Sequence, residues 1–109
     1  MECKGYSIVS QNYRTKRAEI DIIAHLHQGF LGLGKSLLVF VEVRTKYHEQ
    51  YGTPEDTIDY EKRMRLQRNA AAYVHRTKWR GSYRIDAVCL VITHSGLQRI
   101  NHYESIVET

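Results

Sequence analysis

Two segments near the start of the chain alternate apolar and polar residues at every second position, which is the pattern of half-buried β-strands. They cover residues 19–24 and 38–46 and are rich in β-branched side chains. The segment between them, residues 27–36, carries Gly29, Gly32 and Gly34. Glycines between two strand patterns indicate a turn, so the sequence predicts a β-hairpin.

A hairpin that is symmetric about the middle of this turn places Asp21 opposite Glu42 and Glu19 opposite Arg44. All four side chains then share one face, because residues two apart in a strand point the same way. Facing carboxylates repel each other, and apolar neighbours strengthen the repulsion. Mg²⁺, which one or two carboxylates hold, would remove it. The pattern therefore predicts a Mg²⁺ or Mn²⁺ site at Asp21 and Glu42, with Glu19 as an additional acid. The alternative is a slipped register with separated acids and a solvated Glu19–Arg44 pair.

The remaining pattern predicts one helix and three further strands in a single domain, residues 1–109. Thr53 and Pro54, followed by two acids, indicate a helix start. The helix is expected to run to about Thr77, and its first turn can be separate. The expected strands cover residues 6–13, 84–93 and 97–103, of which the second is the most apolar.

One face of this helix carries the residues that recur at helical spacing, namely Lys62, Leu66, Ala70, Tyr73 and Val74. Lys62 therefore lies on the core-facing stripe, near the helix end that follows the acidic hairpin. A lysine there needs an anion, which a carboxylate–metal–phosphate cluster would provide. The alternative is an alkyl stem that carries the ammonium out to solvent.

Basic residues are in excess, with 16 Lys and Arg against 12 Asp and Glu and a formal net charge of +4. This excess favours a polyanionic partner. Residues 62–84 contain eight basic residues and no acid. The predicted nucleic-acid contacts are Arg65, Arg68 and Arg76 on one helix flank, Lys78, Trp79 and Arg80 after the helix, and Arg14, Lys16 and Arg17 in an early turn. The alternatives are ordinary solvated basic surfaces and a core position for Trp79.

Other residues with potential chemistry carry weaker signals. Asp86 is either a third acid or a structural partner of Arg84, and the pairing is the preferred interpretation. His25 and His27 form an isolated pair and do not suggest a four-ligand zinc site. Two cysteines form no disulfide framework, so a reducing, cytoplasmic setting is expected. No apolar run reaches the length of a membrane span, and no membrane association is expected.

The segment Asp21…Glu42-Val43-Arg44 resembles the Asp, hairpin, Glu-x-Lys signature of the PD-(D/E)xK nuclease superfamily, except that Arg44 replaces the lysine. More narrowly, the chain resembles the YraN-like family of uncharacterised bacterial proteins, which are similar to Holliday-junction resolvases. The segments that carry this likeness are Gly5-Tyr6-Ser7-Ile8-Val9, Asn12-Tyr13-Arg14, residues 18–24, residues 40–44, Lys62 and Arg84-Ile85-Asp86.

This resemblance implies an α/β (α+β-like), restriction-endonuclease-like fold with a mixed central β-sheet flanked by helices. It also implies a Mg²⁺-dependent endonuclease in DNA repair or recombination, with branched, Holliday-junction-like DNA as one option, and a homodimer. In the superfamily the lysine orients or activates water. Arg44 cannot act as a base but can clamp phosphate, and Lys46 has the alternation to reach the same face. Relatives carry a helix before the position of Gly5, and this first helix is expected to be missing here.

Two other classes of function stay open. One is a nucleic-acid-binding module of the same fold with a decayed active site. Ala18 in place of a family glycine, Arg44 and the missing helix favour it. The other is a protein-interaction domain without a nucleic-acid role, which the basic stretch 62–84 disfavours.

Overall fold

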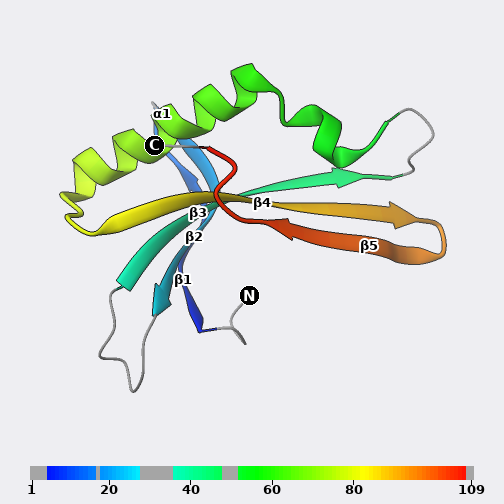
Figure 1. The fold of residues 1–109 in the computed structure, drawn as a ribbon, viewed down its shortest axis with the longest axis horizontal. Coiled ribbons are helices and arrows are strands. Elements are labelled where there is room, and N and C mark those ends of the chain that lie inside the picture. The colour runs from blue at the N-terminus through cyan, green and yellow to red at the C-terminus, as the bar shows by residue number, and fades with distance from the viewer. Residues whose placement is uncertain (1–4, 17, 28–35, 48–51, 108–109) are drawn as a thin grey trace.

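The computed structural model describes residues 5–16, 18–27, 36–47 and 52–107. In chain order, these residues form β1 (Tyr6–Arg14), β2 (Glu19–His27), β3 (Ser36–Lys46), the 3₁₀ turn η3 (Pro54–Thr57), α1 (Tyr60–Thr77), β4 (Ser82–Thr93) and β5 (Gly96–Tyr103) (Figure 1). The predicted sequence of three strands, a helix and two strands is therefore confirmed.

The strands form one sheet in the order β1-β2-β3-β4-β5. The β3–β4 pair is parallel and the other three pairs are antiparallel. A parallel neighbour requires a crossover, and α1 provides it by returning the chain across one face of the sheet (Figure 1). A mixed five-stranded sheet with this helix is compatible with a restriction-endonuclease-like fold.

The β2–β3 hairpin has the predicted register. Its pairs run from Ile22 opposite Val41 to His27 opposite Ser36. The predicted turn itself, residues 28–35, lies outside the described residues. The pairing between β2 and β3 ends at Ile22 and Val41. Next to this pair, the Val43 N–H donates to the side chain of Asp21, at 2.8 Å from Oδ2. The slipped-register alternative is therefore wrong.

Alternation along the strands divides the core between the two faces of the sheet. The face under α1 buries Ile23, Phe40 and Ile85 against Leu66 and Ala70 of the helix. The opposite face buries a smaller cluster, formed by Tyr6, Ala24, Val39 and Val41. Because Glu42 is two residues from Phe40, the strand pattern places its side chain on the helix face, at the margin of the main core.

The helix start differs slightly from the prediction. Thr53 caps η3 and forms a reciprocal capping box with Asp56. The α-helix proper begins at Tyr60, with Asp59 as its N-cap accepting from the Lys62 N–H at 2.8 Å. The first turn is thus separate, and the helix reaches Thr77 as expected. The predicted core stripe is confirmed, since Leu66 and Ala70 are buried and Tyr73 and Val74 pack beside them.

Asp86 is a structural residue, as the preferred interpretation held. It is fully buried and accepts two hydrogen bonds from Arg84, each of 2.8 Å. His102 Nε2 lies 2.8 Å from Oδ2, and the Ser105 N–H donates to Oδ1 at 3.0 Å. Hydrogen bonds from Arg84 to Asp86 raise the pKa of the guanidinium further above its usual range. Asp86 pairs with Val41 in the sheet, so it points away from the face that holds Glu42.

Candidate active site

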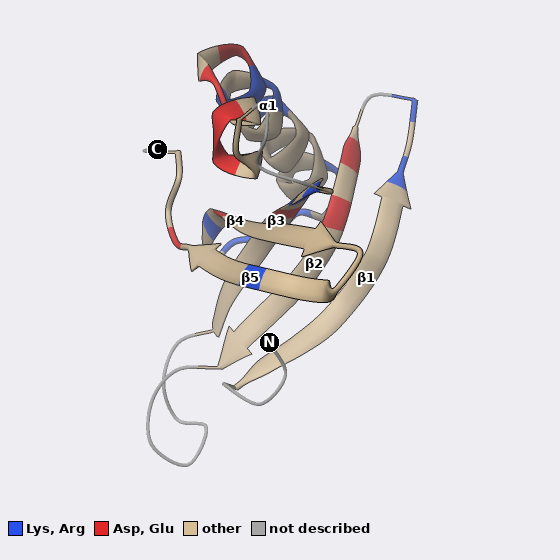
Figure 2. Ribbon diagram, turned by 90° about the vertical axis from the view of Figure 1, so that its right-hand side faces the viewer, with Lys and Arg blue, Asp and Glu red and all other residues tan. Residues whose placement is uncertain are grey.

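The two predicted acids meet where β2 and β3 separate, beside α1. Asp21 is half-buried, whereas Glu42 is buried, with 7% of its surface exposed to solvent. The hydrogen bond from Val43 holds Asp21 against β3. Figure 2 shows the acidic end of β2 beside the helix. The same-face placement inferred from the strand pattern therefore brings Asp21 and Glu42 into contact.

The pKa of Glu42 depends on its burial and on two neighbouring residues, Asp21 and Lys62. Burial raises the pKa of its carboxyl group most strongly, and the hydrogen bond with Asp21 raises it further. Lys62 lowers this pKa, but by less than the other two effects combined. The raised pKa of Glu42 is therefore caused first by burial and then by the nearby Asp21 carboxyl group.

Lys62 provides the positive charge closest to this pair. Its Nζ lies 2.7 Å from Glu42 Oε2, and its side chain is only 20% exposed. The alternative of a solvent-directed ammonium is therefore wrong, and the expected anion partner is Glu42. No donor in the described part of the chain reaches the buried Oε2 with hydrogen-bond geometry, although the ammonium is close.

Arg44 lies at the edge of the acidic pair and is held mainly by Thr57. Its Nε donates to Thr57 Oγ1 at 2.8 Å, and its nearest guanidinium nitrogen is 3.9 Å from Glu42 Oε2. Thr57 is fixed in turn, because its hydroxyl donates to the Pro54 carbonyl at 2.7 Å. The turn η3 thus orients the arginine that occupies the lysine position of the motif.

The structure does not bring Lys46 or Glu19 into the cluster. Lys46 is the last residue of β3, and among the described residues it makes no ion pair with either acid. Glu19 pairs with Arg14 at 2.9 Å, and the two side chains are 64% and 75% exposed. The Glu19–Arg44 pair of the alternative interpretation is therefore absent from the described contacts.

Asn69 is a buried polar residue of α1 that the sequence interpretation missed. Its Nδ2 donates to the Glu19 carbonyl at 2.9 Å and so ties the helix to the start of β2. The sequence did offer a signal for it: Asn69 directly precedes Ala70 on the apolar side of the helix, where a polar side chain needs a hydrogen-bond partner. Together with the Lys62–Glu42 pair, this bond fixes α1 over the acidic strands.

Two carboxylates are a suitable protein ligand set for Mg²⁺, which retains water and phosphate oxygens in its other positions. Within the described ranges, no three His, Cys, Asp or Glu side chains gather into a larger cluster. The residues present fit a single cation at Asp21 and Glu42, because the two carboxyl groups lie together and because burial and the neighbouring Asp21 raise the pKa of Glu42, a cost that a cation would offset.

A family model and several similar proteins all point to the same protein family. The model of the uncharacterised protein family UPF0102 matches residues 1–90. The chain belongs to the UPF0102 family. This is the YraN-like family that the motifs indicated, and that part of the resemblance is confirmed.

Several members named UPF0102 protein are similar along much of this chain. The Cytophaga hutchinsonii protein is 32% identical over 90 residues, which cover 83% of this chain and 73% of the relative. The Alkaliphilus metalliredigens protein is 41% identical over 76 residues, or 70% of this chain and 60% of the relative. The Herpetosiphon aurantiacus protein is 30% identical over 107 residues, or 94% and 79%. The chain therefore aligns with about 60–80% of the length of these UPF0102 relatives.

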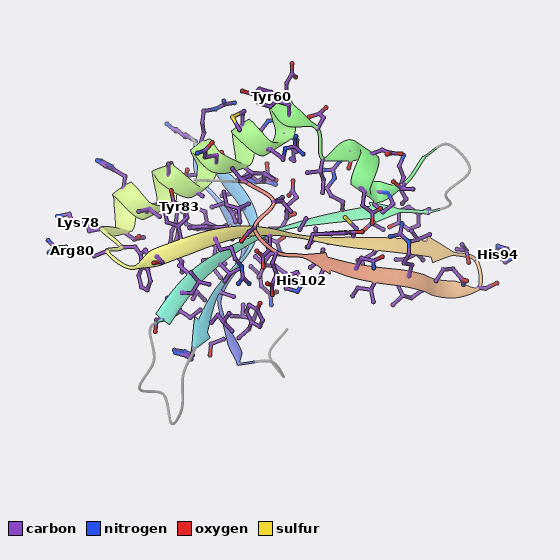
Figure 3. All side chains as sticks on the ribbon, in the orientation of Figure 1. Tyr60, Lys78, Arg80, Tyr83, His94 and His102 are labelled. Carbon is purple, nitrogen blue, oxygen red and sulfur yellow. The ribbon has the colours of Figure 1, made fainter. Side chains whose placement is uncertain are left out.

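The predicted basic surface of this UPF0102 chain is present on α1. Arg65, Arg68 and Arg76 are exposed, and Arg76 donates to the Tyr13 hydroxyl at 2.7 Å. Lys78 and Arg80 project at the far end of the helix from Tyr60 (Figure 3). Arg14, the last residue of β1, and Lys16, in the turn that follows, are exposed, whereas Arg17 lies outside the described residues. No described helix is long and apolar enough to cross a membrane.

Trp79 is partly buried rather than fully exposed. Its ring is half-buried, stacks on His25 with centroids 5.3 Å apart and donates to the Ser82 carbonyl at 3.0 Å. A Cβ at Gly81 would approach this ring to 2.7 Å, so the chain needs glycine there. Trp79 thus packs beside the main core, as the alternative held, and its role in stacking a base stays a prediction.

Glu55 links η3 to β5. Because Thr57 of η3 holds Arg44, the contribution of Glu55 to stability tests how firmly this turn is anchored. Its Oε2 accepts from Tyr103 at 2.6 Å, and both oxygens accept from Arg99. The Arg99 hydrogen bonds chiefly lower the pKa of Glu55 to about 2. A depressed pKa adds stability above the unfolded-state value near 4.5, and this stability is lost as pH falls towards 2.

We therefore expect Glu55→Gln to lower the melting temperature by about 4 °C at pH 7. The difference from wild type should shrink as pH falls from about 4.5 to 2, because both proteins then carry a neutral side chain. Thermal unfolding followed by circular dichroism measures both values. Glu61→Gln, which removes an exposed acid of α1, is the control and should show little effect. A Glu55 difference that is equal at pH 7 and pH 2.5 would contradict the assignment.

Proposed function

We propose that this UPF0102 protein is a metal-dependent endonuclease that acts on DNA, with Mg²⁺ or Mn²⁺ as cofactor. The observation that carries the proposal is the buried Glu42 carboxylate in contact with Asp21, with the Lys62 ammonium 2.7 Å from Oε2. In phosphodiester hydrolysis, two adjacent carboxylates can hold a divalent cation, and a neighbouring lysine can orient the attacking water. The resemblance to PD-(D/E)xK nucleases and Holliday-junction resolvases supports the same activity in repair or recombination.

In this proposal Asp21 and Glu42 hold the divalent cation. When bound, the cation lowers the pKa of its water and neutralises charge on the phosphate. Lys62 reaches the carboxylate from the helix side and orients the attacking water through its ammonium. Arg44, fixed by Thr57, binds a phosphate oxygen through its remaining N–H groups. In this proposal, Lys62 of α1 takes the role of the superfamily's motif lysine, whose position on β3 is occupied here by Arg44.

Cleavage assays with labelled linear, flapped and four-way DNA test the proposed activity. Wild type should cut one or more of these substrates only when Mg²⁺ or Mn²⁺ is present. Asp21→Asn should bind the same DNA without cutting it, because one of the two cation ligands is lost. Cutting that continues in EDTA, or that survives in Asp21→Asn at the wild-type rate, would reject the mechanism.

The exposed arginines of α1 provide the proposed DNA contacts. We expect simultaneous replacement of Arg65, Arg68 and Arg76 by alanine to weaken duplex binding and to flatten the plot of log K against log salt. Each lost phosphate contact should reduce the slope by about 0.9, because fewer counterions are released. Fluorescence anisotropy at several salt concentrations measures this slope.

The matched control replaces the same three arginines with lysine. This variant retains the charges and should retain the wild-type slope. If the alanine variant also keeps that slope, the flank is solvated surface and makes no phosphate contact.

A decayed nucleic-acid-binding module is the second candidate. The observation that favours it is the Lys62–Glu42 ion pair itself, because an ammonium at 2.7 Å partly neutralises Glu42 without a metal. Wild type would then bind DNA and cut none of the substrates, and Arg44→Lys would restore a trace of cleavage at most. A cytoplasmic location and pairing of two copies across DNA belong to both versions of the proposal.

A further inference from the structure

A cavity of about 880 Å³ lies between the turn after β1 and the C-terminal half of α1. It falls within the roughly 300–1,000 Å³ typical of sites for small ligands. Its wall on the β1 side includes Tyr13, Arg14 and Lys16, and its wall on the helix side includes Tyr73 and Arg76. Figure 2 shows the basic turn after β1 projecting beside the helix. The Asp21–Glu42 cluster is separate from this cavity.

Aromatic rings form a rigid part of the cavity. Tyr13 and Tyr73 meet edge to face, with centroids 5.1 Å apart. Tyr73 is braced from behind by Phe40 at 5.4 Å, and Tyr13 is held by the hydrogen bond from Arg76. Fixed aromatic side chains at a basic surface are typical of sites where an unpaired nucleobase stacks.

The charges around the cavity suit a phosphate. Arg14 and Lys16 are exposed on one side, and Arg76 is exposed on the other. The nearby acid is Glu19, which Arg14 already pairs at 2.9 Å. Three cations against one acid leave a net positive surface around the aromatic pair, which attracts an anionic ligand that also carries an apolar ring.

The position of the cavity connects it to the proposed active site. Arg14 is the register partner of Glu19, and Glu19 precedes Asp21 by two residues, or about 7 Å of strand. Asn69 fixes α1 to the Glu19 carbonyl at the same point. A strand of DNA whose phosphate lies at Asp21 and Glu42 would therefore bring an adjacent nucleotide to the cavity.

We infer that this cavity binds one unpaired nucleotide of a DNA strand, with its base against Tyr13 and Tyr73 and its phosphate on Arg14, Lys16 and Arg76. The inference rests on the proposed function and narrows its substrate to DNA with an unpaired nucleotide beside a duplex, such as a flap or a gap. A fully paired duplex or four-way junction can fill the cavity only by extruding a base, which costs unstacking energy.

Binding in the Asp21→Asn background tests the inference without cleavage. Fluorescence anisotropy would compare a duplex that carries a one-nucleotide flap, the same duplex with an abasic flap, a nicked duplex and a four-way junction. We expect the flap with a base to bind about fivefold tighter or more than the other three. Equal affinity for all four would overturn the inference.

Variants then locate the preference. Arg14→Ala combined with Lys16→Ala should reduce the flap preference to below about twofold. Lys78→Ala combined with Arg80→Ala removes the same charge outside the cavity; it should weaken binding to all four DNAs about equally and leave the affinity ratio unchanged. Ala72→Leu narrows the cavity without changing charge and should also reduce the ratio. An equal loss of flap preference in both charge variants, or an unchanged ratio in Arg14→Ala/Lys16→Ala, would show that the cavity does not select the flap.

A final arm separates a nucleotide of DNA from a free nucleotide. Deoxyadenosine monophosphate should compete with the flap DNA only at concentrations far above the dissociation constant of that DNA. Tight binding of the free nucleotide without a flap preference would overturn the inference. A flap preference in a protein that never cuts DNA would defeat the proposed nuclease alone. Metal-dependent cleavage without any flap preference would defeat this inference alone.

Discussion

Replacing Lys62 with methionine is expected to slow metal-dependent DNA cleavage by about 100-fold or more. Methionine retains most of the apolar stem on α1 but removes the ammonium that lies 2.7 Å from Glu42 Oε2. In the proposed mechanism, the attacking water and the phosphate then lose the ammonium that orients and stabilises them. Single-turnover cleavage of labelled DNA under saturating Mg²⁺ measures the effect on the chemical step.

Two matched variants separate Lys62 from the other basic residues of the motif. Lys46→Met makes the same change at the end of β3 and should cost little, because Lys46 makes no described contact with the acids. Arg44→Lys should preserve or raise cleavage. The pKa of Glu42, followed by NMR, should rise further in Lys62→Met, since Lys62 lowers it in wild type. Full activity of Lys62→Met together with an unchanged Glu42 pKa would remove Lys62 from the mechanism.

The largest expected loss of stability follows replacement of Asp86 by alanine. Asp86 is fully buried, and its removal leaves the Arg84 guanidinium without its bidentate partner. Removing one partner of a buried ion pair typically costs about 3–5 kcal/mol, since the remaining charge is left uncompensated. We therefore expect Asp86→Ala to lower the free energy of unfolding by this amount, as measured by urea denaturation.

Glu104→Gln is the control for Asp86. Glu104 also lies near Arg84, at 3.7 Å, but its side chain is 61% exposed. An exposed pair of this kind contributes little, so the variant should change the unfolding free energy by less than about 1 kcal/mol. Equal effects of the two variants would show that the buried Asp86 network is not a main support of β4.

The sequence carried enough information to predict the pairing of the acidic strands, because apolar alternation assigns each side chain to a face and symmetry about the glycine-rich turn sets the register. The same reasoning placed Lys62 on the stripe with Leu66, and the structure gives it Glu42 as a partner. The preference for an Arg84–Asp86 pair was also correct. These features depend on local periodicity, which a sequence displays directly.

Contacts between distant segments could not be predicted in this way. Arg44 is held by Thr57 of η3, and nothing in the β3 pattern points to that hydroxyl. Trp79 follows a basic helix in the sequence, yet it packs on His25 of β2. The aromatic cavity depends on Tyr13 and Tyr73, which are 60 residues apart and meet only when α1 crosses the sheet.

The raised pKa of Glu42 predicts how the stability of the metal-free protein changes with pH. A carboxyl group whose pKa is higher in the folded than in the unfolded protein destabilises the fold as pH rises through the interval between the two values. Above that interval the metal-free protein therefore carries an electrostatic cost. Glu42→Gln should leave its thermal stability level or raise it at pH 7. Cation binding needs the ionised carboxylate, so affinity should fall on acidification while pH is still above 4.5.

Isothermal titration with Mn²⁺ at pH 7.5 tests the central claim most directly, because it requires neither DNA nor catalysis. Wild type should bind one ion, and Asp21→Asn and Glu42→Gln should each abolish binding, whereas Glu19→Gln should retain it because that acid lies outside the cluster. Loss of binding in both cluster variants, with a folded protein, is the predicted result. Binding that persists unchanged in Asp21→Asn and Glu42→Gln would contradict a metal site at these two carboxylates.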